Sequence, residues 1–312
     1  MHRRQMSLYS KLSTAMAEPH EIPRYLNEAY HTGGFRREHN PDGIDFFEAD
    51  WDNLVILDAC RLDSFRELAD LPGELETRTS RAASTPEFVA SNLAGKRLHD
   101  TVYVTANGYV SSLREEFGYG FHHLENLFEE RYWDDEFATV LPETTTEAAI
   151  EVADAYPNKR LVAHYIQPHW PFVGPTARRA FGDVSNYDDR NTNVWEQIRA
   201  GAIDVSDEAL RRAYRETLER ALSSVERLVA ELDGRTVVTA DHGQLLGHRV
   251  SPVPIKEYGH PDRLYVPDLV EVPWQVIDGE RREIVSEGSA SGTSVADGDV
   301  VRQRLNQLGY VE

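Results

Sequence analysis

The chain has 312 residues, of which 53 are acidic and 33 are lysine or arginine, so its formal net charge is −20. A surface this acidic opposes nucleic-acid binding, which needs basic density along a groove. The acidic excess is typical of halophilic proteins and indicates solubility rather than a fold. No stretch reaches the roughly 18 apolar residues of a membrane span, and a single cysteine excludes an internal disulfide. We therefore expect a cytoplasmic protein with no integral membrane segment and no nucleic-acid partner.

Strand and helix patterns alternate from residue 51 onward, whereas residues 1–50 are polar and irregular and are expected to wrap the core. Short apolar runs rich in β-branched residues predict buried strands. Helical spacing with a capping residue or a following proline predicts helices. The expected elements are, in chain order, a strand at 53–58, a helix from 63, a strand at 101–106, a helix at 143–155, a strand at 160–166, a helix at 206–232, strands at 235–240 and 272–277, and a closing helix at 299–308.

This alternation predicts the α/β class, with a mostly parallel sheet flanked by helices. We expect residues 51–312 to form a single domain. The segment 278–294 is rich in glycine, serine and glutamate and is expected to be a mobile loop.

Two of the predicted strands end in acidic residues. Asp58 ends the run Asn53 to Leu57, and Asp241 with His242 ends the run that closes the strand at 235–240. Open α/β sheets place their chemistry at the carboxyl ends of their strands, and carboxylate and imidazole groups are good metal ligands. The pattern predicts a metal site shared by the two strands, although either aspartate could simply cap a helix.

A second candidate feature lies between these strands, where Ser84 and Thr85 precede Pro86 and Glu87. A hydroxyl residue followed by proline and an acid is typical of a helix start, so Thr85 could be no more than a cap. A hydroxyl at a helix N-terminus can also act as a nucleophile, because anionic groups dock there. If Thr85 also binds the metal ion, its proton is lost more easily.

Histidine and lysine side chains supply the remaining candidates. His169 follows the strand at 160–166 within a proline-rich loop, and His260 follows Lys256 shortly before the strand at 272–277. His164 lies inside a predicted strand and is interpreted as a core histidine.

The order of these motifs resembles the sulfatase branch of the alkaline phosphatase superfamily, over roughly residues 50–277. The resemblance rests on Asp58, the hydroxyl-proline helix start, the 168–172 loop, the Asp-His-Gly segment at 241–243 and the Gly-His pair at 259–260. It implies an alkaline-phosphatase-like fold in which one divalent metal ion, Mn, Mg, Ca or Zn, is bound by Asp58, Asp241 and His242.

The resemblance also implies roles for the other candidates. Ser84 or Thr85 would be the nucleophile, since Ser84 fits the family's sequence frame and Thr85 fits the cap. His169, Lys256 and His260 would contact the substrate, and Arg61 would be structural or face the phosphate.

One departure bears on the reaction. Sulfatases use a cysteine, oxidised to formylglycine, at the position that Ser84 occupies here, and Cys60 is expected at the end of a different strand. We therefore predict a metal-dependent hydrolase or transferase that acts on a phosphoester of a small molecule, glycan or lipid head group. The alternatives are a sulfate-ester hydrolase without formylglycine and a non-catalytic metal-binding scaffold.

Overall fold

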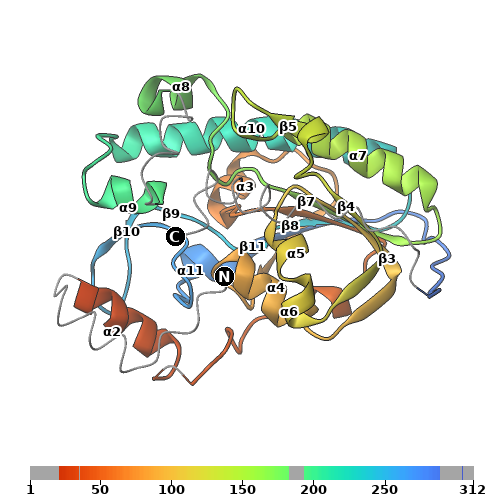
Figure 1. The fold of residues 1–312 in the computed structure, drawn as a ribbon, viewed down its shortest axis with the longest axis horizontal. Helices are drawn as coiled ribbons and strands as arrows, with labels where there is room; N and C mark the ends of the chain where they lie inside the picture. Colours follow the sequence, from red (N-terminus) through yellow and green to blue (C-terminus); the bar gives the residue numbers. More distant parts are fainter. Residues whose placement is uncertain (1–20, 35, 183–192, 289–303, 305–312) are drawn as a thin grey trace.

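The computed structural model describes residues 21–34, 36–182, 193–288 and 304. Its centre is a seven-stranded sheet in the spatial order β2, β11, β8, β1, β7, β3, β4 (Figure 1). These strands are β1 (Asn53–Leu57), β2 (Glu74–Thr79), β3 (Arg97–Thr105), β4 (Gly120–Asn126), β7 (Arg160–Tyr165), β8 (Thr236–Thr239) and β11 (Glu271–Ile277).

The middle of the sheet is parallel and buried. β1 pairs in parallel with β7 and β8, so that Asn53 lies opposite Leu161 and Thr236. Side chains along β1 are buried on both faces of the sheet, which explains why its sequence is continuously apolar rather than alternating. β11 runs antiparallel to both β8 and β2. The predicted α/β class with a mostly parallel sheet is confirmed, and one strand of the sheet is reversed.

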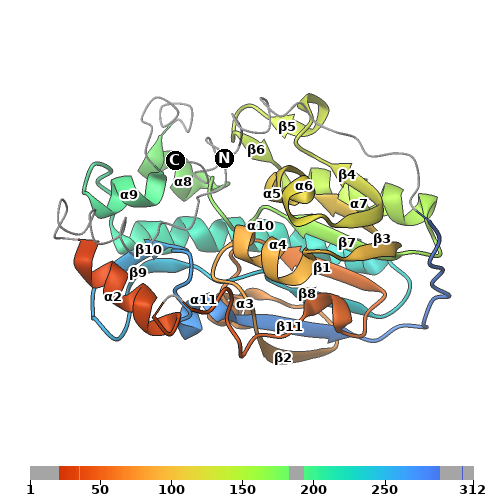
Figure 2. The ribbon, with the colours of Figure 1, turned by 60° about the horizontal axis from the view of Figure 1, so that its bottom comes forward.

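Helices cover both faces of this sheet. Figures 1 and 2 show α7 (Pro142–Ala155) and α10 (Asp207–Glu231) along one face, and α4 (Thr85–Leu93), α5 (Tyr109–Ser112) and α6 (Arg114–Phe117) on the other. α10 begins where the sequence predicts, because the Ser206 hydroxyl accepts a hydrogen bond from the backbone N–H of Ala209. Its apolar face, which includes Leu210, Tyr214 and Leu218, is buried toward the core.

The other elements surround this layered centre. They are α2 (Ile22–His31), η2 (Phe46–Glu48), α3 (Leu62–Leu68), η3 (Glu130–Tyr132), β5 (Trp133–Asp134), β6 (Thr139–Val140), α8 (Pro175–Phe181), α9 (Val194–Arg199), β9 (Leu245–Arg249), β10 (Lys256–Gly259) and α11 (Pro267–Val270). β9 and β10 form an antiparallel pair apart from the main sheet. Among the described residues, no helix is both long enough and apolar enough to cross a bilayer.

The described part of the N-terminal segment is more ordered than predicted. It contains the ten-residue helix α2, whose N-cap position holds Glu21 rather than one of the preferred capping residues. Asn27 of α2 hydrogen-bonds the backbone of Val253, while Phe46 and Phe47 are buried in the main core. The prediction that this segment is irregular is therefore wrong for α2.

The segment after β11 lies at the amino ends of the central strands. The backbone N–H of Val285 donates to the carbonyl of Asn158, just before β7, and Arg282 donates to the side-chain oxygen of Asn53, at the start of β1. Residues 278–288 have no regular secondary structure but carry these hydrogen bonds. The rest of the loop predicted at 278–294, and all of the closing helix predicted at 299–308 apart from Arg304, lie outside the described residues.

Candidate active site

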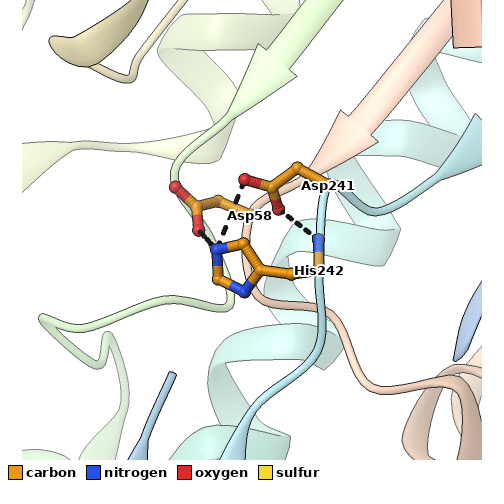
Figure 3. A group of neighbouring side chains, drawn as sticks. All are labelled: Asp58, Asp241 and His242. Atoms are coloured by element: carbon orange, nitrogen blue, oxygen red, sulfur yellow. Dashed lines mark hydrogen bonds and ion pairs between the residues drawn. The ribbon is translucent and has the colours of Figure 1, made fainter. Parts of the chain in front are cut away.

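The carboxyl ends of the central strands bring the predicted strand-end acids together. Asp58 follows β1, and Asp241 and His242 follow β8, its parallel neighbour. All three side chains are fully buried. One potential ligand atom from each lies within 4.8 Å of the others (Figure 3). Strands about 180 residues apart in sequence thus form one cluster at the edge of the sheet, which is where open α/β sheets bind ligands.

The hydrogen bonds of His242 orient its ring toward both carboxylates. Nδ1 lies 2.8 Å from the carbonyl oxygen of Gly243, and a carbonyl can only accept, so Nδ1 carries a proton. Nε2 lies 3.4 Å from Oδ2 of Asp241 and 3.6 Å from Oδ1 of Asp58 (Figure 3). In the neutral ring, the Nε2 lone pair would then face two carboxylates. This donor set fits a divalent cation, whose histidine ligands typically donate their other N–H to a backbone carbonyl.

Backbone N–H groups bind one of the two carboxylate oxygens of Asp241. Its Oδ1 accepts the N–H groups of Ala59, at 3.1 Å, and of His242, at 2.9 Å. Its Oδ2 is turned toward the cluster, where it accepts a hydrogen bond of 2.8 Å from the hydroxyl of Thr85. One oxygen therefore fixes the carboxylate in place, and the other is presented to the site.

Thr85 is the hydroxyl residue that joins this cluster. Besides Asp241, its Oγ1 lies 3.4 Å from Oδ2 of Asp58 and 3.4 Å from Nε2 of His242. The Ser84 hydroxyl is equally buried, but it makes no cap bond and has no hydrogen-bond partner among the described residues. α4 begins at Thr85, with Ser84 in extended conformation at the N-cap position. The cap interpretation of Thr85 is therefore wrong by one residue.

Asn107 is a member of the cluster that the sequence analysis missed. Its Nδ2 lies 2.5 Å from Oδ2 of Asp58 and 3.4 Å from Oγ1 of Thr85, and its side chain is fully buried. A signal was present, because Asn107 follows the strand predicted at 101–106, just as Asp58 and Asp241 follow theirs. Amide side chains at strand ends are therefore candidate site residues, as acids are.

His169 and His260 lie beside the cluster, while their predicted contact with a substrate stays a prediction. The two Nε2 atoms are 2.8 Å apart, and the rings of His260 and His242 have centroids 4.6 Å apart. Nδ1 of His169 lies 2.6 Å from the carbonyl oxygen of Trp170. Burial lowers the pKa of His169 to about 3 and that of His260 well below its usual range. Both rings are therefore neutral at physiological pH, and His260 can donate its Nε2 proton to His169.

Lys256 and Arg61 are both paired with carboxylates in the structure. The Lys256 ammonium forms an ion pair of 2.7 Å with Asp207, and its side chain is 46% exposed at the start of β10. The guanidinium of Arg61 is bound by Asp63, by Asp268 and by the backbone oxygen of Gln244. The donors of Arg61 are directed at these three residues, and contacts of Arg61 or Lys256 with a substrate stay predictions.

Two buried side chains belong to the surroundings of the site rather than to its ligands. His164, inside β7, is bound to the hydroxyl of Tyr103 at 3.0 Å, and burial lowers its pKa to about 4. Burial also raises the pKa of the Cys60 thiol well above its usual range. The thiol is therefore protonated at neutral pH, which opposes a role as nucleophile.

Glu87, in the first turn of α4, makes the stability of the protein depend on pH. Its carboxyl group accepts the backbone N–H of Ala83 at 2.9 Å. Burial and then the charge of Asp262 raise its pKa to about 8. Because the folded-state pKa lies above the ordinary value of 4.5, the folded protein holds the proton more tightly than the unfolded chain. The resulting stability is fully present below pH 4.5 and is lost as the pH rises through about 8.

We therefore expect Glu87→Gln, which keeps an acceptor for Ala83, to stabilise the protein increasingly as the pH rises. The difference in free energy of unfolding between variant and wild type is expected to be small near pH 5 and on the order of a few kcal/mol at pH 9. Thermal unfolding at both pH values measures it. An equal effect at pH 5 and pH 9 would contradict the raised pKa.

Comparisons with known proteins give structural neighbours only. No family model and no curated protein matches the chain. Among solved structures, the C-terminal periplasmic domain of a phosphoethanolamine transferase from Campylobacter jejuni is 13% identical, with a TM-score of 0.44 over 72% of this chain and 78% of that one. A protein in the alkaline phosphatase superfamily from Vibrio parahaemolyticus is 11% identical, with a TM-score of 0.45 over 88% and 70%.

A third neighbour, a phosphonate monoester hydrolase from Silicibacter pomeroyi, is 15% identical, with a TM-score of 0.42 over 82% of this chain and 72% of that one. The Vibrio protein is described as a member of the superfamily that the sequence motifs resemble. At TM-scores below 0.5, the likeness carries no argument about the reaction. Any indication of the reaction must come from the side chains around Asp58.

Proposed function

We propose that this chain is a metal-dependent phosphoester hydrolase or phosphotransferase whose nucleophile is Thr85. The observation that carries the proposal is the position of the Thr85 hydroxyl, 2.8 Å from Asp241 and 3.4 Å from both Asp58 and His242. A buried hydroxyl among potential metal ligands is the arrangement that metal activation of an alcohol nucleophile needs.

Asp58, Asp241 and His242 would hold the metal ion, with Thr85 as a further ligand. When bound, the ion would supply positive charge that lowers the pKa of the hydroxyl and offsets the charge developing on the ester oxygens. A mixed set of carboxylate and imidazole ligands favours Zn²⁺ or Mn²⁺ over the harder Ca²⁺ and Mg²⁺.

The reaction would begin with the loss of the Thr85 proton to solvent water, since a bound ion would lower the pKa of that hydroxyl. Oγ1 would then attack the phosphorus atom. The bond from phosphorus to the leaving oxygen would break, that oxygen would take a proton from water, and Thr85 would become phosphothreonine. Attack by water would complete a hydrolysis, and attack by an acceptor alcohol would complete a transfer.

The neighbouring polar groups would position the transferring phosphoryl group. His260 lies against His242, and its Nε2–H, which is directed at Nε2 of His169, would donate to an oxygen of the phosphoryl group. Asn107 donates to Oδ2 of Asp58 and would keep that carboxylate turned toward the metal ion. Such prearranged groups stabilise a transition state because they need no reorganisation during the reaction.

The esterified alcohol stays a prediction, as a small molecule, a glycan or a lipid head group, and so does a cytoplasmic location. The reaction class can be tested with aryl phosphomonoester, phosphodiester and sulfate substrates, at high salt, with Zn, Mn, Mg or Ca added to chelator-treated protein. We expect turnover of a phosphoester that needs added metal and is strongest with Zn or Mn. Turnover of the sulfate ester alone would contradict the proposal, as would phosphoester turnover that persists undiminished after chelation.

A further inference from the structure

The turn that follows β1 is unusually constrained. Ala59 has a φ of +59°, a left-handed conformation that residues with a side chain seldom adopt. This conformation directs the backbone N–H of Ala59 at Oδ1 of Asp241, 3.1 Å away. The turn that follows Asp58, one predicted metal ligand, therefore fixes the carboxylate of Asp241, another.

The rest of the turn is held to the strands on either side. The N–H of Asp58 donates to the carbonyl of Tyr165 at 3.1 Å, and the carbonyl of Asp58 accepts the N–H of His169 at 3.1 Å. The N–H of Cys60 lies 3.3 Å from the carbonyl of Leu57. The carbonyl of Ala59 and the N–H of Arg61 take no part in these bonds. Both groups are buried, and a buried backbone group without a hydrogen bond destabilises the fold.

One hydroxyl satisfies both groups. Tyr214, which is fully buried on α10, accepts the N–H of Arg61 at 2.8 Å and donates to the carbonyl of Ala59 at 2.9 Å. The hydroxyl thus bridges the two ends of the turn and ties it to the long helix that covers this face of the sheet.

We propose that Tyr214 is a positioning residue for the metal centre. Its hydroxyl holds the peptide of Ala59 in the left-handed conformation, and the N–H of Ala59 in turn orients Asp241, so that Oδ2 faces the site. The inference rests on the metal site in the proposed function. Groups that hydrogen-bond a metal ligand directly typically change metal affinity by 10- to 100-fold, and Tyr214 acts through one such group, the N–H of Ala59.

Tyr165 provides a matched control. It is also fully buried, at the end of β7, and its hydroxyl also makes a hydrogen bond within the core, 2.7 Å from Oγ1 of Thr146. That bond joins β7 to α7 and does not involve the side chain of a predicted metal ligand. Both substitutions remove a buried phenolic hydroxyl. The hydroxyl removed in Tyr165→Phe contacts Thr146, whereas the one removed in Tyr214→Phe contacts the backbone of Ala59 and Arg61.

The experiment is a calorimetric titration of Zn²⁺ or Mn²⁺ into the chelator-treated full chain, as wild type and as each phenylalanine variant. We expect the dissociation constant of Tyr214→Phe to rise by about 10-fold or more, and that of Tyr165→Phe to stay within about twofold. Near-UV circular dichroism and the melting temperature show whether each variant is folded. Both variants keep the aromatic ring that fills the core.

Hydrogen exchange gives a second measurement on the same proteins. The amide of Arg61 is expected to exchange faster in Tyr214→Phe than in wild type or Tyr165→Phe. Unchanged metal affinity in Tyr214→Phe, or an equal loss in both variants, would overturn the positioning role while the metal site stands. Absence of metal binding by the wild type would instead refute the metal site itself, and the inference with it.

Discussion

Thr85→Ala is expected to lower metal-dependent phosphoester turnover by about 10³-fold or more, whereas Ser84→Ala is expected to change it by less than about fivefold. The two hydroxyls are adjacent and both are buried, yet that of Thr85 contacts Asp58, Asp241 and His242. The Ser84 hydroxyl makes no cap bond, so its removal leaves the helix start intact. The pair of variants therefore separates the nucleophile from its neighbour within one loop.

The measurement is the rate constant of each variant on the best aryl phosphoester, together with its metal affinity. Thr85→Ala is expected to retain most of its metal binding, because Asp58, Asp241 and His242 remain, so a loss of turnover would report on the nucleophile. The account fails if Ser84→Ala loses activity and Thr85→Ala keeps it.

Asp241→Asn is expected to weaken metal binding by about 100-fold or more and, in the metal-free protein, to raise the melting temperature. Asp58 and Asp241 are both fully buried, and each has an oxygen within 3.6 Å of the same nitrogen of His242. Two carboxylates held in a buried site repel each other, and the isosteric amide removes one charge. It keeps an oxygen to accept the N–H groups of Ala59 and His242.

Thermal unfolding with and without metal tests both effects at once. A ligand at 100 times its dissociation constant stabilises the folded state by about 2.7 kcal/mol, and this gain is expected for wild type but not for Asp241→Asn. Asp207→Asn serves as the control, since Asp207 pairs with Lys256 at the surface. A metal-induced rise in the melting temperature of Asp241→Asn equal to that of wild type would rule out Asp241 as a ligand.

The sequence predicts the site best where a polar residue comes directly after a buried strand. Asp58, Asp241 and His242 end runs so apolar that only buried strands fit them, and parallel neighbours bring their ends together. Asn107 obeys the same rule, which holds for amide side chains as well as for acids. Tyr214 could not be found in this way, because its hydroxyl reaches the turn from another layer, and helical periodicity marks it only as a core residue.

Rules based on local sequence fail where tertiary packing determines which side chain enters the site. The one-residue difference between Ser84 and Thr85 lies within the usual uncertainty of a helix boundary, yet it determines which hydroxyl enters the site. Lys256 and His260 are four residues apart, but the side chain of Lys256, on β10, pairs with Asp207 while His260, just after the strand, reaches His169. The two side chains have different partners because of where the β9–β10 pair lies relative to α10, which the local sequence does not encode.

The central claim is that Thr85 is covalently phosphorylated during turnover. The most direct measurement is mass spectrometry of peptides from wild-type protein quenched in acid while it turns over a phosphoester in the presence of metal. We expect a phosphoryl group on the peptide that contains Thr85, assigned to Thr85 by fragmentation and absent when the metal is chelated. A phosphoryl group on Ser84, or sustained turnover of the same substrate with no labelled peptide at any quench time, would contradict the claim.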